Sequence, residues 1–152
     1  MRAAKSAESP AIRDPFDDLL GYHLRRLSVK VMADLSAALK PLELNPADAS
    51  ILFVINSRPG ITQSDVGKQL GILRANMAPL IGTLVQRGFI ERETIDGRSQ
   101  ALNLTSLGLG ACRQANAAAR VHEERLFGAL PEATRRRLIK QIRALWQRDE
   151  EG

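Results

Sequence analysis

The feature that most constrains this chain is a change of hydrophobic period between residues 62 and 105. Residues 62–87 contain two segments with apolar residues three or four apart, separated by Gly71. The helical period then gives way to two short strand-like segments, residues 89–95 and 100–105, on either side of Asp96-Gly97-Arg98-Ser99. A period near 3.6 predicts helices, and a period of two around a turn predicts a β-hairpin. The sequence therefore predicts two helices joined by a glycine turn, with a hairpin directly after them.

Longer helices are predicted before this unit. Asp14-Pro15 has the aspartate and the proline expected at a helix N-terminus. Lys40-Pro41 ends that helix, because the residue before a proline avoids helical geometry. Asn45-Pro46 begins a second helix, with Asp48 near the positive end of its dipole. Residues 51–55 of this helix are all apolar, so we expect it at the centre of the core.

Two further helices are predicted after the hairpin. Thr105 is placed to cap an alanine-rich helix that extends to about Ala129, and Leu130-Pro131 begins the last helix. The predicted fold is mainly α with a small β-hairpin, in the order α-α-α-α-β-β-α-α. The first and the last two helices carry more apolar surface than one chain can cover, which predicts two-fold pairing. An internally packed helical layer in a monomer is the alternative.

The composition limits the class of protein. With 152 residues, 44% hydrophobic and 26% charged, the chain fits a flexible N-terminal arm, residues 1–13, and one globular domain, residues 14–152. Its longest apolar run, Ile51–Ile55, is far shorter than the ~20 residues of a membrane-spanning helix. A single cysteine, Cys112, and an N-terminus without a secretory signal lead us to expect a cytoplasmic protein without a membrane partner.

The charge and the predicted fold together indicate a nucleic-acid partner. The net charge is +5, and arginine provides 17 of the 22 basic residues, which favours a polyanion. A helix-turn-helix places its second helix in the major groove of double-stranded DNA, and a hairpin directly after it, called a wing, reaches a neighbouring minor groove. Arg98 at the tip of the wing suits the negative potential of a narrow minor groove.

The second helix of the pair, which would recognise the bases, contains a proline. A proline inside a helix costs ~3 kcal/mol or more, but it is tolerated in the first turn. If Asn76 is the N-cap, Pro79 lies in the first turn, and we expect a late or bent start to this helix. Asn76 then either caps the backbone or remains free to bind adenine through N6 and N7. The sequence leaves both roles open.

The residues of this region resemble a known family. The stretches PGITQSDVGKQLGI, QRGFIER and DGRSQALNLT are similar to MarR-type transcriptional regulators, and the resemblance covers the chain from Asp14 to Arg148. The family's wing has an Asp-x-Arg followed by an apolar strand that ends in Leu-Thr. Asp96, Arg98, Leu104 and Thr105 match this pattern in place. The recognition helix departs from it, because residues 73–79 lack the usual polar start.

The resemblance implies a homodimeric winged helix-turn-helix regulator that binds a pseudo-palindromic operator. The winged helix-turn-helix would occupy about residues 45–105, and the dimerisation helices about residues 14–40 and 105–149. The wing arginine would enter the minor groove, with the aspartate helping to hold it. The residues predicted to contact DNA are Thr62, Gln63, Ser64, Arg74, Ala75, Asn76, Pro79, Arg87, Asp96, Arg98 and Ser99.

The resemblance also implies a repressor that a small effector releases from DNA. Such effectors are often aromatic and anionic, and a coenzyme A thioester of an aromatic acid would suit the many arginines. The effector cleft is expected between the dimer helices and the winged domain, and its predicted lining is Tyr22, His23, Arg26, Met32 and Phe53. Arg26 would pair with a carboxylate, and Tyr22 and Phe53 would flank a ring.

Other classes of function have weaker support. His23 and His122 are the only histidines and no second cysteine exists, so neither a metal site nor a cofactor is expected. No nucleophile beside a base and no phosphate-binding glycine pattern indicates an enzyme. Cys112 raises the alternative of a thiol-based redox sensor, although we expect it to be buried and inert. A winged-helix module that binds a protein surface is the other alternative.

Overall fold

The computed structural model describes residues 14–97 and 99–147. The described elements include one 3-10 helix, and most of the chain is α-helical. In chain order they are α1 (Leu20–Leu39), η1 (Lys40–Leu42), α2 (Pro46–Ser57), β1 (Ile61–Thr62), α3 (Gln63–Leu70), α4 (Arg74–Gln86), β2 (Ile90–Thr94), β3 (Gln100–Leu104), α5 (Ser106–Phe127) and α6 (Glu132–Trp146). The predicted mainly α fold with a β-hairpin is confirmed. The strand β1 and the helix η1 were not predicted.

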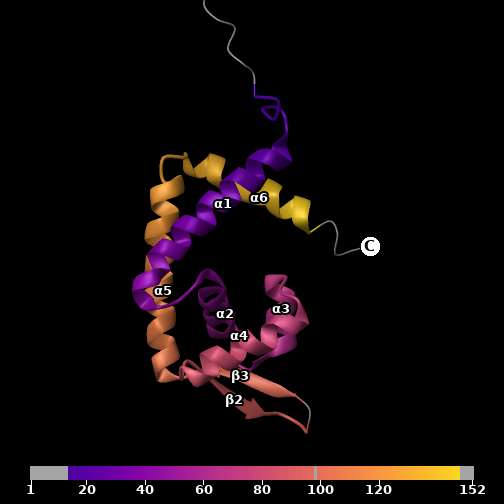
Figure 1. Ribbon diagram of the computed structural model, residues 1–152, viewed down its shortest axis with the longest axis vertical. Helices are drawn as coiled ribbons and strands as arrows, with labels where there is room; N and C mark the ends of the chain where they lie inside the picture. Colours follow the sequence, from indigo (N-terminus) through magenta and orange to yellow (C-terminus); the bar gives the residue numbers. More distant parts are fainter. Residues whose placement is uncertain (1–13, 98, 148–152) are drawn as a thin grey trace, which may run out of the picture.

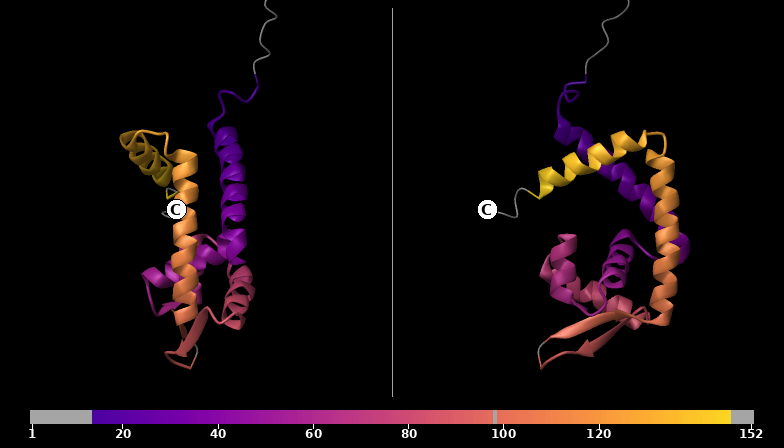
Figure 2. Two further views of the ribbon diagram at one scale, coloured as in Figure 1. Left: turned by 90° about the vertical axis from the view of Figure 1, so that its left-hand side faces the viewer. Right: turned by 180° about the vertical axis from the view of Figure 1, so that it is seen from behind.

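The elements divide into a lower and an upper part (Figure 1). Helices α2, α3 and α4 and the hairpin β2–β3 lie together at one end, and α5 runs from the hairpin to the other end, where α1 and α6 lie. Figure 2 shows that α1 and α6 lie on opposite sides of α5. Within one chain, α6 therefore does not pack along the length of α1.

The apolar core is centred on α2, as its sequence predicts. Ile51, Leu52 and Ile55 of this helix are fully buried. They pack against Met77, Ile81 and Leu84 of α4, Leu102 of β3 and Cys112 and Ala115 of α5, within one cluster. At one end of α2 the Asn45 side chain accepts a hydrogen bond from the Asp48 N–H at 2.9 Å, and Asp48 Oδ2 accepts one from the Asn45 N–H at 3.2 Å. This capping box confirms the predicted start of α2.

The sheet has three antiparallel strands in the order β1-β3-β2. In the hairpin, Ile90 pairs with Leu104 and Thr94 with Gln100. The added strand β1 pairs Ile61 with Leu102. A strand of two residues is too short to show any hydrophobic period, so no sequence pattern predicts it. Its pairing ties the N-terminus of α3 to the base of the wing.

The predicted start of the first helix is wrong. α1 begins at Leu20 rather than near Asp14, and its N-cap residue, Leu19, makes no side-chain cap bond. The Asp14 side chain instead accepts a hydrogen bond from the Phe16 N–H at 3.0 Å, which closes a local turn. Phe16 and Leu19 are exposed, so burial in the core of the described residues does not favour extending the helix across them. The end of α1 at Leu39, just before Lys40-Pro41, agrees with the prediction.

The start of α5 is held at the base of the wing. Thr105 Oγ1 accepts a hydrogen bond from the Gly108 N–H at 3.0 Å, which confirms the predicted cap, and donates to the Gly88 carbonyl. A Cβ at Gly108 would collide with the backbone carbonyl of Phe89. Glycine at this position therefore allows the first turn of α5 to lie against the segment that joins α4 to β2.

Candidate nucleic-acid interface

The helix-turn-helix consists of α3 and α4. Thr62 caps α3, because its Oγ1 accepts from the Asp65 N–H at 3.2 Å and donates to Asp65 Oδ2 at 2.8 Å. Gly71 ends α3 with a φ of 64°, a left-handed conformation that glycine adopts at little cost. A Cβ on Gly67 would lie 3.0 Å from the Met77 side chain, so the two helices pack closely. This close contact fixes the direction of α4.

The recognition helix α4 begins at Arg74, so the expected late start is wrong and, of the two roles left open for Asn76, that of N-cap does not apply. Leu73 is the N-cap residue and makes no side-chain cap bond. The Asn76 N–H bonds to the Leu73 carbonyl at 2.8 Å, so Asn76 already lies in the first turn. Burial of Met77 against α3 favours this early start. The Asn76 side chain is exposed and makes no hydrogen bond among the described residues.

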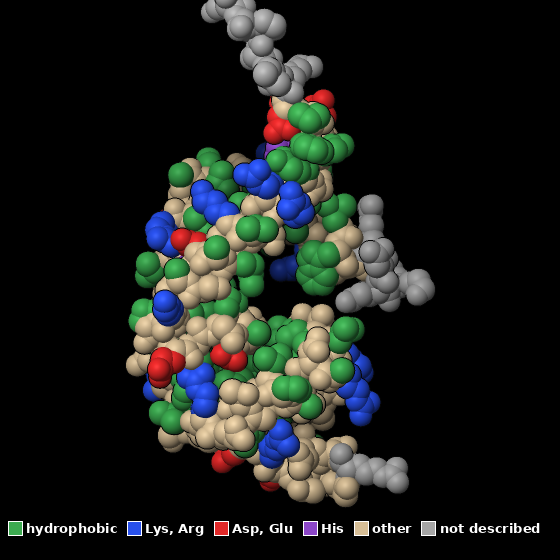
Figure 3. All heavy atoms as spheres, viewed as in Figure 1, with side chains coloured by type: hydrophobic (Ala, Val, Ile, Leu, Met, Phe, Trp, Pro, Cys, Tyr) green, Lys and Arg blue, Asp and Glu red, His purple; other side chains and the backbone are tan. Residues whose placement is uncertain are grey.

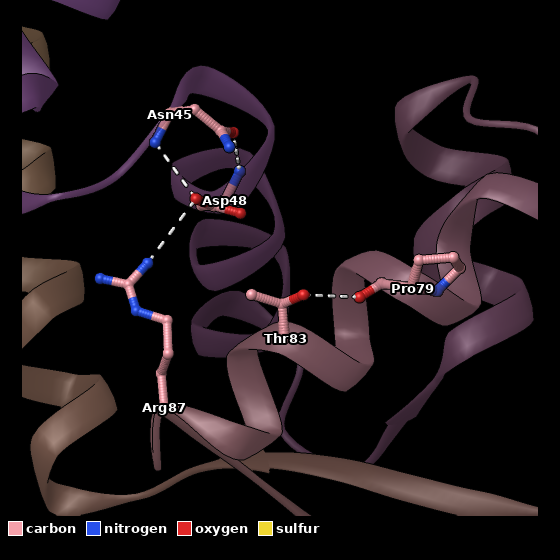
Figure 4. Close-up of polar contacts among 5 residues, drawn as sticks. All are labelled: Asn45, Asp48, Pro79, Thr83 and Arg87. Atoms are coloured by element: carbon pink, nitrogen blue, oxygen red, sulfur yellow. Dashed lines mark hydrogen bonds and ion pairs between the residues drawn. The ribbon is translucent and has the colours of Figure 1, made fainter.

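Pro79 consequently lies inside α4, not in its first turn. Proline has no N–H, so it cannot donate to the carbonyl of Ala75 as another residue would. Both residues are exposed, and water can bind the carbonyl that lost its donor. The Thr83 hydroxyl donates to the Pro79 carbonyl at 3.0 Å, as Figure 4 shows. The helix therefore tolerates a proline on its outer surface.

A hollow of about 950 Å³ lies between α3, the first turn of α4 and the wing. Six residues of the predicted DNA-contact set line it: Thr62, Gln63, Ser64, Arg74, Asp96 and Ser99. The fold thus brings together residues that lie up to 37 positions apart (99 minus 62) in the sequence. Backbone N–H groups at the N-terminus of α3 and the exposed cation of Arg74 make one side of the hollow suitable for an anion.

The hollow also contains residues that were not predicted. Lys68 lies one turn after Ser64 on α3, and its ammonium is 3.8 Å from the Asp65 carboxylate in an exposed pair. The spacing of four residues from Ser64 was the signal that could have identified it. Thr94 and Gln100, a cross-strand pair of the wing, complete the wall opposite α3.

Arg87 lies at the other end of α4, away from the hollow. Its guanidinium is 3.9 Å from the Asp48 carboxylate and lies over the Phe89 ring at 4.7 Å. Figure 4 shows this link between the end of α4 and the capping box of α2. The structure therefore gives Arg87 contacts within the protein. Its contact with DNA stays a prediction.

The tip of the wing is closed by its own polar groups. The Ser99 N–H donates to Asp96 Oδ1 at 2.7 Å, and the Ile95 N–H donates to the Ser99 carbonyl at 3.0 Å. The predicted minor-groove residue, Arg98, lies outside the described residues. The carboxylate of Asp96 therefore holds the backbone of Ser99 in place.

The five predicted effector residues do not form one site within a single chain. Tyr22, His23 and Arg26 lie near the start of α1, where Arg26 donates to the Tyr22 hydroxyl at 2.9 Å. The Tyr22 ring stacks on Phe16 with 4.7 Å between centroids. Phe53 lies on α2 and packs against the core. Helix α2 belongs to the lower part of the molecule, whereas α1 starts in the upper part (Figure 1).

A charged cluster that the sequence did not reveal joins α1 to α5. His122 Nδ1 lies 2.7 Å from Asp34 Oδ2, and the Arg125 guanidinium contacts the same oxygen. His122 is buried, and the hydrogen bond from its ring is the main reason that the pKa of Asp34 lies below its ordinary value. The two partners are 88 residues apart, so no local pattern could predict their pairing.

The described residues do not support a reactive thiol, a metal site or a membrane-spanning helix. Cys112 is buried, its thiol donates to the Leu52 carbonyl at 3.7 Å, and burial raises its pKa, which disfavours a reactive thiolate. No group of three or more histidine, cysteine or acidic residues suited to a metal occurs in residues 14–97 and 99–147. Within the same residues, no helix has the length and apolar character needed to span a membrane.

Comparisons with known proteins agree with this geometry. The sequence profile of the MarR family matches residues 42–99. The transcriptional repressor CouR, solved bound to a 23-mer DNA duplex, superposes with a TM-score of 0.79 and 32% identity over 84% of this chain and 92% of that one. A structure of CouR bound to p-coumaroyl-CoA has a TM-score of 0.77 and 30% identity, covering 86% and 93% of the two chains.

Relatives found by sequence similarity also have names that describe transcriptional regulators. The HTH-type transcriptional repressor Rv2887 of Mycobacterium tuberculosis is 25% identical over 85% of this chain and 94% of its own. A structure of that protein with salicylic acid has a TM-score of 0.68 and 25% identity over 85% of this chain and 97% of that one. A candidate regulator of the hcr operon of Thauera aromatica is 27% identical over 87% and 81% of the two chains. The chain belongs to the MarR family of transcriptional regulators.

Proposed function

We propose that this protein is a homodimeric repressor that binds double-stranded DNA and is released by a small aromatic acyl effector. The observation that carries the proposal is the arrangement around the hollow, where the exposed face of α4, the N-terminus of α3 and the wing converge. Helix α4 enters the major groove and the wing enters the adjacent minor groove. The hollow between them takes the sugar–phosphate strand that separates the two grooves.

The roles of the DNA-contact residues follow from their places. At the start of α3, Gln63 and Ser64 offer amide, hydroxyl and backbone N–H groups to a phosphate, and Thr62, whose hydroxyl donates to Asp65, caps the helix beside them. Arg74 adds a cation at the start of α4. Ala75, Asn76 and Pro79 face the bases from α4, and Asp96 and Ser99 shape the wing tip so that Arg98 enters the minor groove. Arg87 is a weaker candidate, because Asp48 and Phe89 already engage it.

The dimer is proposed from α1 and α6. No residue of α6 is buried, although Leu138, Ile142 and Trp146 place apolar side chains along one face of it. Figure 3 shows an opening between the upper helices and the winged region, with hydrophobic side chains along its edge. A second chain would bury this surface and place two recognition helices on one face of the DNA, about 34 Å apart.

The effector class is proposed from the relatives and from the start of α1. The solved relatives hold p-coumaroyl-CoA or salicylic acid, which share an aromatic acyl group. Tyr22 and Arg26 supply a ring and a cation that already contact each other, with His23 and Met32 on the same helix. Phe53 would come near this set only if the dimerisation helices close over α2. We further infer that the protein acts in the cytoplasm and is not an enzyme.

The experiment that tests this function is a titration of the purified protein onto DNA flanking its own gene, at two salt concentrations. We expect nanomolar binding, stronger than to random DNA, that weakens steeply with salt because bound phosphates release counterions. Binding that is weak and independent of sequence would favour an architectural or protein-binding role. Binding that does not respond to salt would favour a protein-interaction module. p-Coumaroyl-CoA and salicylate, added in separate titrations, distinguish a thioester effector from a free acid.

Arg98→Ala tests the wing. We expect the variant to remain folded and its DNA complex to lose on the order of 1–3 kcal/mol, because one minor-groove contact is removed. Circular dichroism provides the control for folding. Unchanged operator affinity would remove the wing tip from the mechanism.

A further inference from the structure

The surface that α4 presents to DNA is nearly apolar. Met77, Ile81 and Leu84 of this helix are buried, so residues on the opposite side face outward. At 3.6 residues per turn that outer face contains Ala75, Pro79, Gly82, Thr83 and Gln86. In its first two turns this face consists of the Ala75 methyl group and the Pro79 ring, and in the third turn the Thr83 hydroxyl donates to the Pro79 carbonyl.

Two polar side chains flank this apolar surface in the first turn, Arg74 and Asn76. Because α4 begins at Arg74, the Asn76 amide is not needed as a cap. It is exposed at the edge of the outer face and has no hydrogen-bond partner among the described residues. The N-terminal turns of a recognition helix are the ones that reach base edges. The amide is therefore available for a base.

We propose that α4 recognises adjacent A·T pairs in each half-site. Asn76 binds one adenine, its amide oxygen accepting from N6 and its amide nitrogen donating to N7, while Ala75 and Pro79 contact thymine methyl groups. This inference rests on the proposed binding of DNA by α4. It adds the class of base pair and the residues that select it.

The chemistry of the groove edges favours these pairs. Only an asparagine or glutamine amide matches the donor–acceptor pair of adenine in the major groove, and only thymine offers a methyl group to an apolar side chain. Guanine is best recognised by arginine or lysine, and the outer face of α4 contains neither, because Arg74 lies off this face and lines the hollow. Ala75 and Pro79 lie about 6 Å apart along the axis, close to two base steps of about 3.4 Å each.

The test begins with selection of duplexes from a random library by the purified full-length protein. Within the selected half-site, 7-deazaadenine replaces each adenine, which removes only N7, and deoxyuridine replaces each thymine, which removes only the methyl group. Fluorescence anisotropy then measures affinity. We expect one 7-deazaadenine to weaken binding on the order of 10-fold. We expect deoxyuridine to weaken it roughly fourfold at each contacted thymine.

Variants connect these losses to the residues. Asn76→Ala should bind adenine and 7-deazaadenine duplexes equally and should select any base at that position. Pro79→Ala should fold, because it restores an N–H to the helix, and should lose most of the deoxyuridine effect. Asn116→Ala is the matched control, since Asn116 is an exposed asparagine on α5, away from the hollow, that bonds to Arg120 at 3.0 Å. It should keep the selected sequence and both analogue effects.

The outcomes distinguish a failure of the proposed function from a failure of base recognition by α4. If the wild-type protein selects no sequence, the proposed function itself fails. If it selects a sequence but Asn76→Ala selects the same one, specific DNA binding stands and the inference is wrong. An even loss of affinity for all duplexes in Asn76→Ala would assign this residue to a phosphate, which also overturns the inference. Selection of G·C pairs opposite Ala75 and Pro79, or no response to deoxyuridine, overturns the thymine contacts.

Discussion

The winged region, residues 45–105, and the helix α6 use apolar residues in opposite ways. In the winged region, Ile51, Ile81 and Leu102 come from different elements and are all buried in one cluster. In α6, Leu138, Ile142 and Leu145 form a stripe at helical spacing, yet each is at least 40% exposed. The same amphipathic pattern thus closes a core in one region and leaves an open face in the other. An open face of this kind is stabilised only when another surface covers it.

Helix α5 belongs to both regions. Its first half contributes Cys112 and Ala115 to the core of the winged region, and its second half contributes His122 to the charged cluster with α1. Packing against α2 and β3, with the hydrogen bonds of Thr105 and Cys112, holds the first half, whereas an ion pair and a hydrogen bond tie the second half to α1. A change at the dimer helices can therefore reach the DNA-binding elements through one continuous helix.

The largest expected effect sharpens this contrast. Leu52→Ala should destabilise the winged region by about 2–5 kcal/mol, because it leaves a cavity in a closed core. Ile142→Ala in α6 should instead lower the unfolding midpoint mainly at high protein concentration, and its difference from the wild-type protein should shrink on dilution, because the substitution weakens association between chains. Urea denaturation at several protein concentrations measures both. A concentration-independent loss in Ile142→Ala would show that α6 packs within its own chain.

A pair of glycines two residues apart in α5 tests how tightly the winged region is closed. Gly108→Ala should destabilise the protein by about 1–3 kcal/mol, since its Cβ would collide with the Phe89 carbonyl. Gly110→Ala, whose Cβ meets only the end of the Arg113 side chain at 4.0 Å, should be neutral or stabilising by up to about 1 kcal/mol. Thermal unfolding compares them. Equal effects would mean that the start of α5 can move away from the wing.

The cluster of Asp34, His122 and Arg125 makes the connection between α1 and α5 sensitive to acid. The hydrogen bond from His122 and the charge of Arg125 hold the pKa of Asp34 below its ordinary value of 3.8. A carboxylate with a depressed pKa stabilises the folded state above its ordinary pKa, and this contribution is lost as the pH falls through the folded value.

We therefore expect the difference in unfolding free energy between the wild-type protein and Asp34→Asn to shrink as the pH falls below about 4. Urea denaturation over a pH series measures it. A difference that stays constant down to pH 2 would show that the Asp34 carboxylate does not stabilise the fold. Asp18→Asn, on the exposed turn before α1, serves as the control.

The smallest expected effect concerns Cys112. Because its thiol is buried and its pKa is raised, hydrogen peroxide should leave the DNA affinity of the wild-type protein unchanged. Anisotropy titrations before and after treatment measure this. If peroxide released the wild-type protein from DNA but not Cys112→Ser, the winged region would contain a redox sensor after all.

The sequence determined the parts of this protein that depend on neighbouring residues. The Asn45 and Thr105 caps, the end of α3 at Gly71 and the hairpin around residues 96–99 are local, and each was predicted from a few residues. The order of the helices followed from hydrophobic periods. Six of the residues that line the hollow were identified because turn, cap and wing occur at characteristic spacings in a winged helix-turn-helix.

Only the tertiary structure decided the features that need distant partners. The strand β1 exists because β3 lies beside it, and α4 begins at Arg74 because Met77 packs against α3. The proline that indicated a late start is tolerated on an exposed face, which leaves Asn76 free. Asp34 and His122 pair across 88 residues. Local propensities differ by about 1 kcal/mol or less for most residues, whereas burying a side chain is worth about 1.5–3 kcal/mol, so packing overrides them where they conflict.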